Sequence, residues 1–379
     1  MLRSYHFFSI FAHIHVQLFL TMRKFISAIL LVLLGAASSF AAEPIKNIIY
    51  LIGDGMGLTS ASMMQIEGSY APTIFDRADN VALITTYSND NRVTDSAAAG
   101  TALATGHKTN NTYLGVSPDG TPLESLTTLA QRQDMATGVV VTTYLQHATP
   151  GAFYAHTTSR HDYNLITEQL AESNFDVAIG GGMELFRDVY GSEEAAIEHL
   201  MEQGFGVART MEQLASEDGA QRVIALLADK EVGAYSGTYL ADATREALRL
   251  VDLRDNDNGF VIMVEGSLID GMGHGNDAQG MQAEMAGFMA AIEVAVEYAE
   301  RNEGTLVVVT ADHETGGLSV VSNNSDFNLS EQGVEYRFST DGHSGVMVPV
   351  YLYGDGAERI NGVLDNATLG AMLKSLISK

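Results

Sequence analysis

Residues 47–57 read Asn47-Ile-Ile-Tyr-Leu-Ile-Gly-Asp-Gly-Met-Gly57, an apolar run that continues into a loop with three glycines. The apolar run predicts a buried β-strand, and such glycines are typical of loops that approach a ligand closely. Asp54 stands in the middle of this loop, where its carboxylate would repel a phosphate or another anion. An anionic ligand can therefore reach the loop only if local positive charge draws it in.

A dinucleotide-binding loop is the alternative interpretation of the same letters. Such a loop requires glycines at the spacing Gly-x-Gly-x-x-Gly, because the third glycine lets the following helix pack closely on the strand. This chain has Leu58 at that third position. The spacing therefore disfavours a nucleotide cofactor.

Apolar runs of strand length recur along the chain. They lie at 48–52, 81–85, 138–142, 176–179, 260–264, 305–310 and 348–353. Helical patterns separate several of these runs, and the clearest places Met281, Met285, Phe288 and Ile292 on one face. Strands that are apolar on both faces and alternate with helices predict an α/β fold, an α/β/α sandwich around a large, mostly parallel sheet. Functional residues of such folds gather at the carboxyl ends of the strands.

The composition excludes several classes of function. The chain has 47 acidic and 21 basic residues, a formal net charge of −26 at pH 7. A surface this negative repels nucleic acid and anionic lipid, so neither a nucleic acid nor a membrane is expected as a partner. The chain has no cysteine, which excludes disulfides, thiol catalysis and cysteine-ligated zinc. Any metal must therefore be bound by His, Asp, Glu or hydroxyl groups.

The N-terminus has the pattern of an export signal. Arg23 and Lys24 precede an apolar core at 25–34, and small residues follow as far as Ala41. We predict a secretion signal over residues 1–41, with Met22 as an alternative start, and a periplasmic or secreted product. The alternative, a membrane anchor, is disfavoured because the apolar core is too short for a good span. Residues 42–379 are expected to form a single catalytic domain.

Carboxylates, imidazoles and hydroxyls occur at the ends of the predicted strands. They are Asp54, His147, Thr149, Glu265, Asp270, His274, Asp312, His313 and His343. Because the fold brings strand ends together, a metal centre explains these residues better than unrelated polar loops. Mixed His and Asp ligation suits zinc, whereas an all-oxygen set suits magnesium or calcium. Asp270 and His274 are four residues apart, so one helical turn would direct both to one metal.

Ser96 is the candidate nucleophile. The following residues, 97–104, are expected to be helical, and Gly106 is expected near the end of that helix. Ser96 would then lie at a helix N-terminus, where free N–H groups stabilise an anion. The alternative is that Asp95 and Ser96 only cap the helix. The chain has no Gly-x-Ser-x-Gly motif, so an ordinary serine hydrolase is disfavoured.

Six motifs in this order resemble those of the alkaline phosphatase family. They are Gly53-Asp-Gly-Met-Gly57, Thr94-Asp-Ser-Ala-Ala-Ala-Gly-Thr-Ala102, Thr157-Thr-Ser-Arg160, Val264-Glu-Gly-Ser-Leu-Ile-Asp270 with His274, Thr310-Ala-Asp-His313 and Gly342-His-Ser-Gly345. They extend from about residue 46 to 354, nearly all of the chain after the leader. The resemblance implies the alkaline-phosphatase fold, and the short segment 318–341 replaces the large crown lobe of many relatives.

The resemblance also implies a function. The chain would hydrolyse phosphate monoesters at alkaline pH through a phosphoserine at Ser96, with Arg160 binding two phosphate oxygens. Small-molecule phosphate monoesters would be its partners. Homodimers are common in the family, and the sequence does not decide whether this chain forms one. The alternatives are a phosphodiesterase or sulfatase of the same superfamily, or an exported protein that binds metal or phosphate without catalysis.

The implied cofactors are two zinc ions and one magnesium ion, and the resemblance assigns ligands to each. The first zinc would be bound by Asp270, His274 and His343, the second by Asp54, Asp312 and His313, and the magnesium by Asp54, Thr149 and Glu265. Two positions depart from the enterobacterial pattern: His147 replaces an aspartate beside the third ion, and Gly271 replaces a lysine.

Overall fold

The computed structural model describes residues 45–233, 237–254, 257–323 and 333–378. Residue contacts group Pro44–Lys379 into one compact unit. The secretion signal predicted over residues 1–41 lies outside the described residues. Within the described ranges, no helix combines the length and the apolar character needed to cross a membrane.

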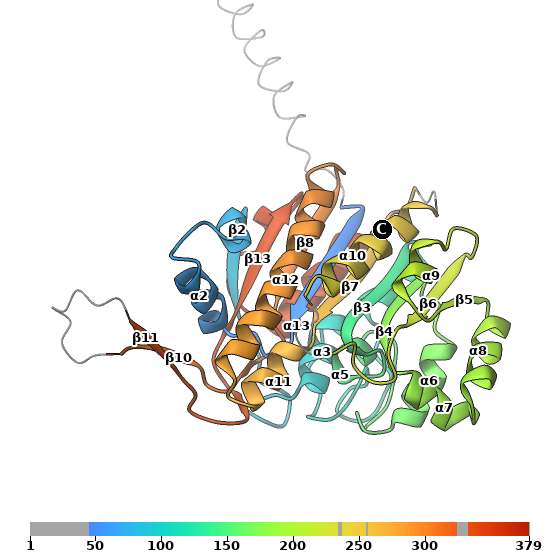
Figure 1. Ribbon diagram of the computed structural model, residues 1–379, viewed down its shortest axis with the longest axis horizontal. Coiled ribbons are helices and arrows are strands. Elements are labelled where there is room, and N and C mark those ends of the chain that lie inside the picture. The colour runs from blue at the N-terminus through green and yellow to red at the C-terminus, as the bar shows by residue number, and fades with distance from the viewer. Residues whose placement is uncertain (1–44, 234–236, 255–256, 324–332, 379) are drawn as a thin grey trace, which may run out of the picture. The chain divides into compact units, whose positions relative to one another are not determined.

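A ten-stranded sheet forms the centre of this unit (Figure 1). In spatial order its strands are β14 (Gly362–Asp365), β2 (Asn80–Thr85), β13 (Val348–Gly354), β8 (Thr305–Thr310), β1 (Asn47–Gly53), β7 (Phe260–Gly266), β3 (Ala136–Tyr144), β4 (Val177–Gly181), β6 (Arg222–Leu226) and β5 (Phe205–Ala208). All neighbouring strands pair in parallel except β13, which is antiparallel to both β8 and β2. Every residue of β1, β7 and β8 is buried, so both faces of the central strands are covered. The predicted α/β class is confirmed.

Helices cover both faces of the sheet. They are α2 (Leu58–Glu67), α3 (Ser96–Thr105), α4 (Leu126–Arg132), α5 (Ala148–Gly151), α6 (Tyr163–Ala171), α7 (Met183–Tyr190), α8 (Glu193–Glu202), α9 (Met211–Ala215), α10 (Tyr239–Asp252), α11 (Leu268–His274), α12 (Ala278–Ala299) and α13 (Asn366–Ile377). Figure 1 shows α10 and α12 in front of the sheet, where they contact one another. The helices α3, α4 and α13 form a second group on the opposite face.

All seven predicted strands are present, but three strands of the main sheet were not predicted. The missed strands are β5, β6 and β14, which are only four or five residues long. Strand β14 lies at the sheet edge and has no fully buried residue, so its sequence lacks a continuous apolar run. A short antiparallel hairpin of β10 (Ser319–Ser322) and β11 (Val334–Arg337) occupies the place of the predicted short crown segment.

The direction of β13 decides which residues meet at the carboxyl edge of the sheet. Because β13 runs against its neighbours, its first residue lies at the edge where β8 ends. The chain just before β13 contains β12 (His343–Ser344), which pairs with β9 (Glu314–Thr315), immediately after β8. The antiparallel strand thus returns His343 to the edge where the parallel strands end.

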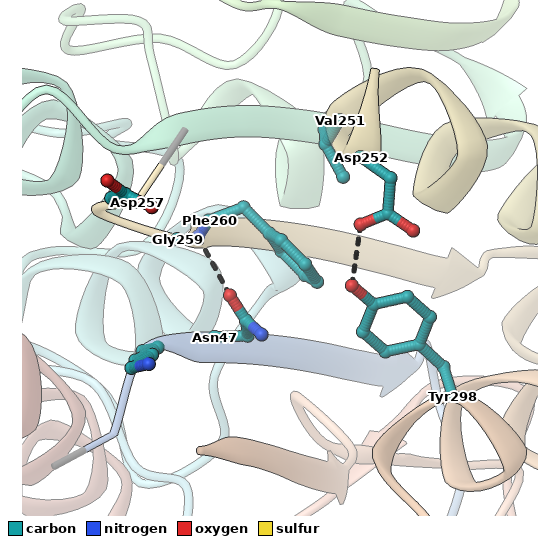
Figure 2. A pocket seen from close by; sticks show the side chains of 8 residues that line it. Asn47, Val251, Asp252, Asp257, Gly259, Phe260 and Tyr298 are labelled. Carbon is teal, nitrogen blue, oxygen red and sulfur yellow. Dashed lines mark hydrogen bonds between the residues drawn. The ribbon is translucent and has the colours of Figure 1, made fainter. Parts of the chain in front are cut away.

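The amino ends of β1 and β7 lie at the opposite edge, beside a cavity of about 290 Å³ (Figure 2). Here the Asn47 side chain donates to Thr305 Oγ1 at 3.0 Å and accepts from the Phe260 N–H at 3.2 Å. Tyr298 donates to Asp252 Oδ1 at 2.6 Å. These polar side chains bond to one another, whereas several buried carboxylates at the carboxyl edge have no such partners.

Helix α3 is packed closely against α13 through a glycine. A Cβ added at Gly370 would lie 2.5 Å from the Ala102 carbonyl oxygen and 2.6 Å from that of Leu103. We predict that Gly370→Ala lowers the free energy of unfolding by about 1–3 kcal/mol, because the two helices must separate. Gly219→Ala is the matched control in open space, with an effect within about 0.5 kcal/mol. Urea unfolding measures both, and equal effects would contradict the packing argument.

Candidate metal centre and active site

A loop after β1 places Asp54 at the centre of the carboxyl edge. Gly55 has φ +73°, and a Cβ added there would lie 2.8 Å from Asp270 Cα, so only glycine fits this turn without strain. The Gly55 N–H donates to Asp312 Oδ1 at 3.1 Å. The glycine therefore lets segments after β1, β7 and β8 approach one another.

Asp54, Asp312 and His313 form one compact, fully buried group. His313 Nε2 lies 3.5 Å from Asp54 Oδ1 and 3.2 Å from Asp312 Oδ2. Ser96 Oγ lies 3.1 Å from the same imidazole nitrogen. The structure thus brings the candidate nucleophile next to three residues that could hold a cation.

Asp270, His274 and His343 form a neighbouring group. His274 Nε2 lies 3.3 Å from Asp270 Oδ2 and 3.3 Å from His343 Nε2, and His343 Nε2 lies 3.6 Å from Asp270 Oδ1. Asp270 and His274 lie one turn apart on α11, as their spacing predicts. Ligand atoms of Asp270, His313 and His343 also lie within 4.8 Å of one another, so the two groups are contiguous.

The imidazoles of these groups are oriented through their Nδ1 atoms. His274 Nδ1 lies 2.6 Å from the Asp341 carbonyl oxygen, and His343 Nδ1 lies 2.8 Å from that of Thr94. A carbonyl oxygen can only accept a hydrogen bond, so in the neutral imidazole, the form that binds a metal, Nδ1 carries the proton and Nε2 keeps its lone pair. Metal-binding histidines are commonly fixed in this way.

A third group contains Asp54, Glu265 and His147, whose ligand atoms lie within 4.8 Å of one another. Glu265 is in β7, and His147 precedes α5, whose Thr149 is also fully buried. The sequence places His147 only beside the ligands of the third ion. In the structure its imidazole is instead close enough to be a ligand itself.

Several polar atoms of the three groups are buried and have no hydrogen-bond partner among the residues that the structure describes. They are both carboxylate oxygens of Asp54, Thr149 Oγ1, Glu265 Oε1, Asp312 Oδ2 and His147 Nδ1. Buried polar atoms are normally paired, because a buried carboxylate that has no partner loses its hydration and gains no interaction in exchange. Bound cations would supply the missing interactions, so these residues fit the metals that the resemblance implies.

Burial strongly changes the acidity of the carboxyl groups. Burial raises the pKa of Glu265 to about 8 and that of Asp312 to about 7, and nearby carboxylates contribute in the same direction. Burial and the charge of Asp312 raise the pKa of Asp54 well above its usual value. Without a cation, these groups therefore hold protons near neutral pH.

Asp270 behaves in the opposite way. Burial acts to raise its pKa, but the hydrogen bond with His274 and the field of His313 outweigh burial and lower it. The same hydrogen bond raises the pKa of His274 to about 9. This pair, in which only His274 is substantially exposed, is therefore stable as an ion pair when no cation is bound.

Asp95 links the nucleophile to the candidate phosphate-binding arginine. Its Oδ1 accepts from the Ala98 N–H at 3.0 Å and caps α3, and its Oδ2 lies 3.2 Å from Arg160 Nη1. Arg160 Nη2 lies 3.3 Å from His147 Nε2. The sequence interprets Asp95 only as a cap, and an N-cap uses one carboxylate oxygen. The second oxygen, Oδ2, also accepts from the Thr112 N–H at 3.1 Å, so it joins the start of α3 to a later loop as well as to Arg160. No local pattern in the sequence indicates these contacts.

The remaining carboxylate of the edge, Glu314, points away from the three groups. Its Oε1 accepts from the Leu318 N–H at 3.0 Å, and its Oε2 accepts from the Ser344 hydroxyl. These bonds connect the turn after β8 to the segment before β13. Both carboxylate oxygens of Glu314 therefore have hydrogen-bond partners within the protein.

Comparison with known proteins identifies what the chain is similar to. A model of the family described as alkaline phosphatase matches residues 45–335. Alkaline phosphatase 4 of Bacillus subtilis is 36% identical over 299 residues, which are 74% of this chain and 63% of that protein. The match therefore spans less than two thirds of that relative's length.

The matches to two solved structures extend over almost the whole length of those structures. The alkaline phosphatase from the Antarctic bacterium TAB5 has a TM-score of 0.81 and 33% identity, over 89% of this chain and 98% of that chain. A histidine-to-aspartate variant of the TAB5 enzyme, with Mg bound in its M3 site, has a TM-score of 0.80 and 33% identity. That match covers 89% of this chain and 99% of the other.

The raised pKa values predict a pH-dependent effect of zinc on stability. Without metal, folded Glu265 and Asp312 hold protons that the unfolded chain has released, between about pH 4 and pH 8. The folded state binds more protons there, so the free energy of unfolding of the metal-free protein falls as pH rises. Zinc bound at Asp312 removes the part of this penalty that Asp312 causes, and we predict that it raises Tm more at about pH 8 than at about pH 5.

Calorimetry of the chelated and the zinc-loaded protein at both pH values measures this difference. Asp312→Asn is the control, because an amide cannot titrate, and it should reduce the difference between the two shifts. An equal Tm shift at both pH values in the unaltered protein would contradict the assignment of these carboxyl groups.

Proposed function

The chain belongs to the alkaline phosphatase family, and we propose that it hydrolyses phosphate monoesters to an alcohol and inorganic phosphate at alkaline pH. One observation carries this proposal. Ser96 Oγ lies at the start of α3, 3.1 Å from His313 Nε2 and next to buried carboxylates that require cations. A hydroxyl in this position can be activated for attack on phosphorus, and a protein that only binds phosphate has no need of it.

Two zinc ions fit the donor sets best. Asp270, His274 and His343 would hold the first, and Asp54, Asp312 and His313 the second, because carboxylate and imidazole together suit zinc. The magnesium ion that the resemblance implies would be held by the oxygen atoms of Asp54, Thr149 and Glu265. The imidazole of His147 adds a donor to this third group that suits zinc better than magnesium.

The residues of the chain have separate tasks in the proposed reaction. Bound cations would supply the positive charge that lowers the pKa of the Ser96 hydroxyl and stabilises the leaving oxygen. Ser96 Oγ bonds to phosphorus as the ester P–O bond breaks, and a phosphoserine forms. Water then hydrolyses the phosphoserine, which releases inorganic phosphate and restores the hydroxyl.

Arg160 binds the phosphate oxygens that do not react. Its planar guanidinium can donate to two oxygens at once, which a lysine does less well. Asp95 holds one side of the guanidinium at 3.2 Å, so the arginine is oriented before a substrate arrives. The free N–H groups at the start of α3 add partial positive charge beside Ser96.

The mature protein would be periplasmic or secreted, because residues 22–41 have the pattern of an export signal. A phosphodiesterase or a sulfatase is the alternative activity within the superfamily. Rates with p-nitrophenyl phosphate, bis-p-nitrophenyl phosphate and p-nitrophenyl sulfate discriminate the three, and we expect the monoester to react fastest.

Replacing the nucleophile tests the proposal directly. We predict that Ser96→Ala loads as much zinc as the unaltered protein, because Ser96 is not among the proposed ligands. Its kcat for p-nitrophenyl phosphate should fall on the order of 10³-fold or more. Chelation should abolish turnover of the unaltered protein, and zinc with magnesium should restore it. Full turnover by Ser96→Ala would refute a phosphoserine at this position.

Gly271 offers a second test, through the affinity for product. A Cβ added at this exposed position of α11 has no atom within 4 Å, and the long side chain of a lysine can extend from there toward solvent. We predict that Gly271→Lys lowers the inhibition constant of inorganic phosphate on the order of fivefold, because it adds a positive charge beside Asp270. Gly271→Ala is the uncharged control. An unchanged inhibition constant in the lysine variant would contradict this prediction.

A further inference from the structure

A cavity of about 250 Å³ lies at the carboxyl edge of the sheet, on the same edge as the candidate active site. Tyr144 at the end of β3 and Tyr163 at the start of α6 line one part of it, and Leu185 of α7 lines another. For comparison, an apolar cavity of about 150 Å³ is enough to bind benzene. The cavity can therefore accept one aromatic ring.

A chain of contacts connects this cavity to the phosphate-binding arginine. The Tyr144 ring meets the His147 ring edge-on, with centroids 5.2 Å apart, and His147 Nε2 lies 3.3 Å from Arg160 Nη2. The Tyr144 and Tyr163 rings are also edge-on, at 5.9 Å, and their hydroxyls lie 3.3 Å apart. Tyr163 follows Arg160 by three residues. One imidazole thus separates the aromatic wall of the cavity from Arg160.

The charged residues of the cavity rim disfavour a second anion. Glu184, Asp188 and Asp229 line the rim together with a single lysine, Lys230. Lys230 lies 3.7 Å from Glu184, and Asp229 pairs with Arg187 at 2.9 Å, so neither cation is free to bind an added negative charge. An aromatic group without negative charge fits this combination of rings, leucine and carboxylates.

We propose that this cavity binds an uncharged aromatic group in the alcohol part of the phosphate monoester, while Arg160 binds the phosphate. This inference rests on the proposed phosphatase activity. The cavity lies beyond His147 rather than at Ser96, so the ring must be joined to the phosphate through a tether long enough to pass the His147 imidazole. The aromatic group packs between the tyrosine rings and Leu185, and the enzyme thereby prefers arylalkyl esters to alkyl esters.

The experiment compares 4-phenylbutyl phosphate with butyl phosphate, which has the same ester linkage and alkyl chain but no ring. In the metal-loaded protein we expect kcat/KM for the phenylbutyl ester to be about tenfold higher, through a lower KM. Tyr163→Ala should reduce this ratio to about one, and Tyr163→Phe should retain most of it. Tyr70→Ala, which removes a tyrosine that is 75% exposed, is the matched control and should leave the ratio unchanged.

A second variant separates loss of the cavity from displacement of Arg160. Leu185→Trp fills the cavity from α7, away from the arginine loop, and should reduce the ratio as Tyr163→Ala does. A displaced arginine would instead lower kcat/KM for both esters by the same factor. A ratio of one in the unaltered protein, or a ratio unchanged in both Tyr163→Ala and Leu185→Trp, would overturn the inference. Hydrolysis of neither ester would instead refute the proposed function.

Discussion

The burial of several carboxylates side by side, away from water, is the constraint on which the rest of the structure depends. Asp54, Glu265 and Asp312 are completely buried, and Asp270 lies against the same cluster. Charged and without counter-ions, such groups would oppose folding, and their raised pKa values express this cost. Cations reverse the sign of the local charge and make the loop around Asp54 attractive to a phosphate. A protein with a net negative charge can therefore still bind an anion at this site.

The sheet topology explains how residues far apart in sequence meet around this cluster. Parallel strands deliver Asp54, Glu265 and Asp312 to one edge, and the antiparallel strand β13 returns His343 to it. Helix α3 directs Ser96 toward His313, and its packing on α13 fixes that direction. Asp95 serves both the helix and Arg160, so one carboxylate determines the positions of the nucleophile and the phosphate-binding group.

Much of this arrangement could be predicted from the sequence. The buried strands are recognisable because strands that are apolar on both faces leave continuous apolar runs in the sequence. The closeness of Asp270 and His274 was predictable because residues four apart in a helix lie on the same face. The edge strand β14 was missed because its exposed residues leave no such run. The second role of Asp95 was not predictable, because it depends on contacts between segments that no local pattern encodes. The resemblance places His147 beside the third ion, but only the structure shows its imidazole close enough to Asp54 and Glu265 to be a ligand itself.

The most direct test of the metal centre is anomalous X-ray diffraction at the zinc absorption edge, on crystals of the zinc-loaded protein. We predict two strong peaks about 4 Å apart. One should be bounded by Asp270, His274 and His343, and the other by Asp54, Asp312 and His313. Zinc bound elsewhere on the acidic surface, with no peak among these side chains, would contradict the account.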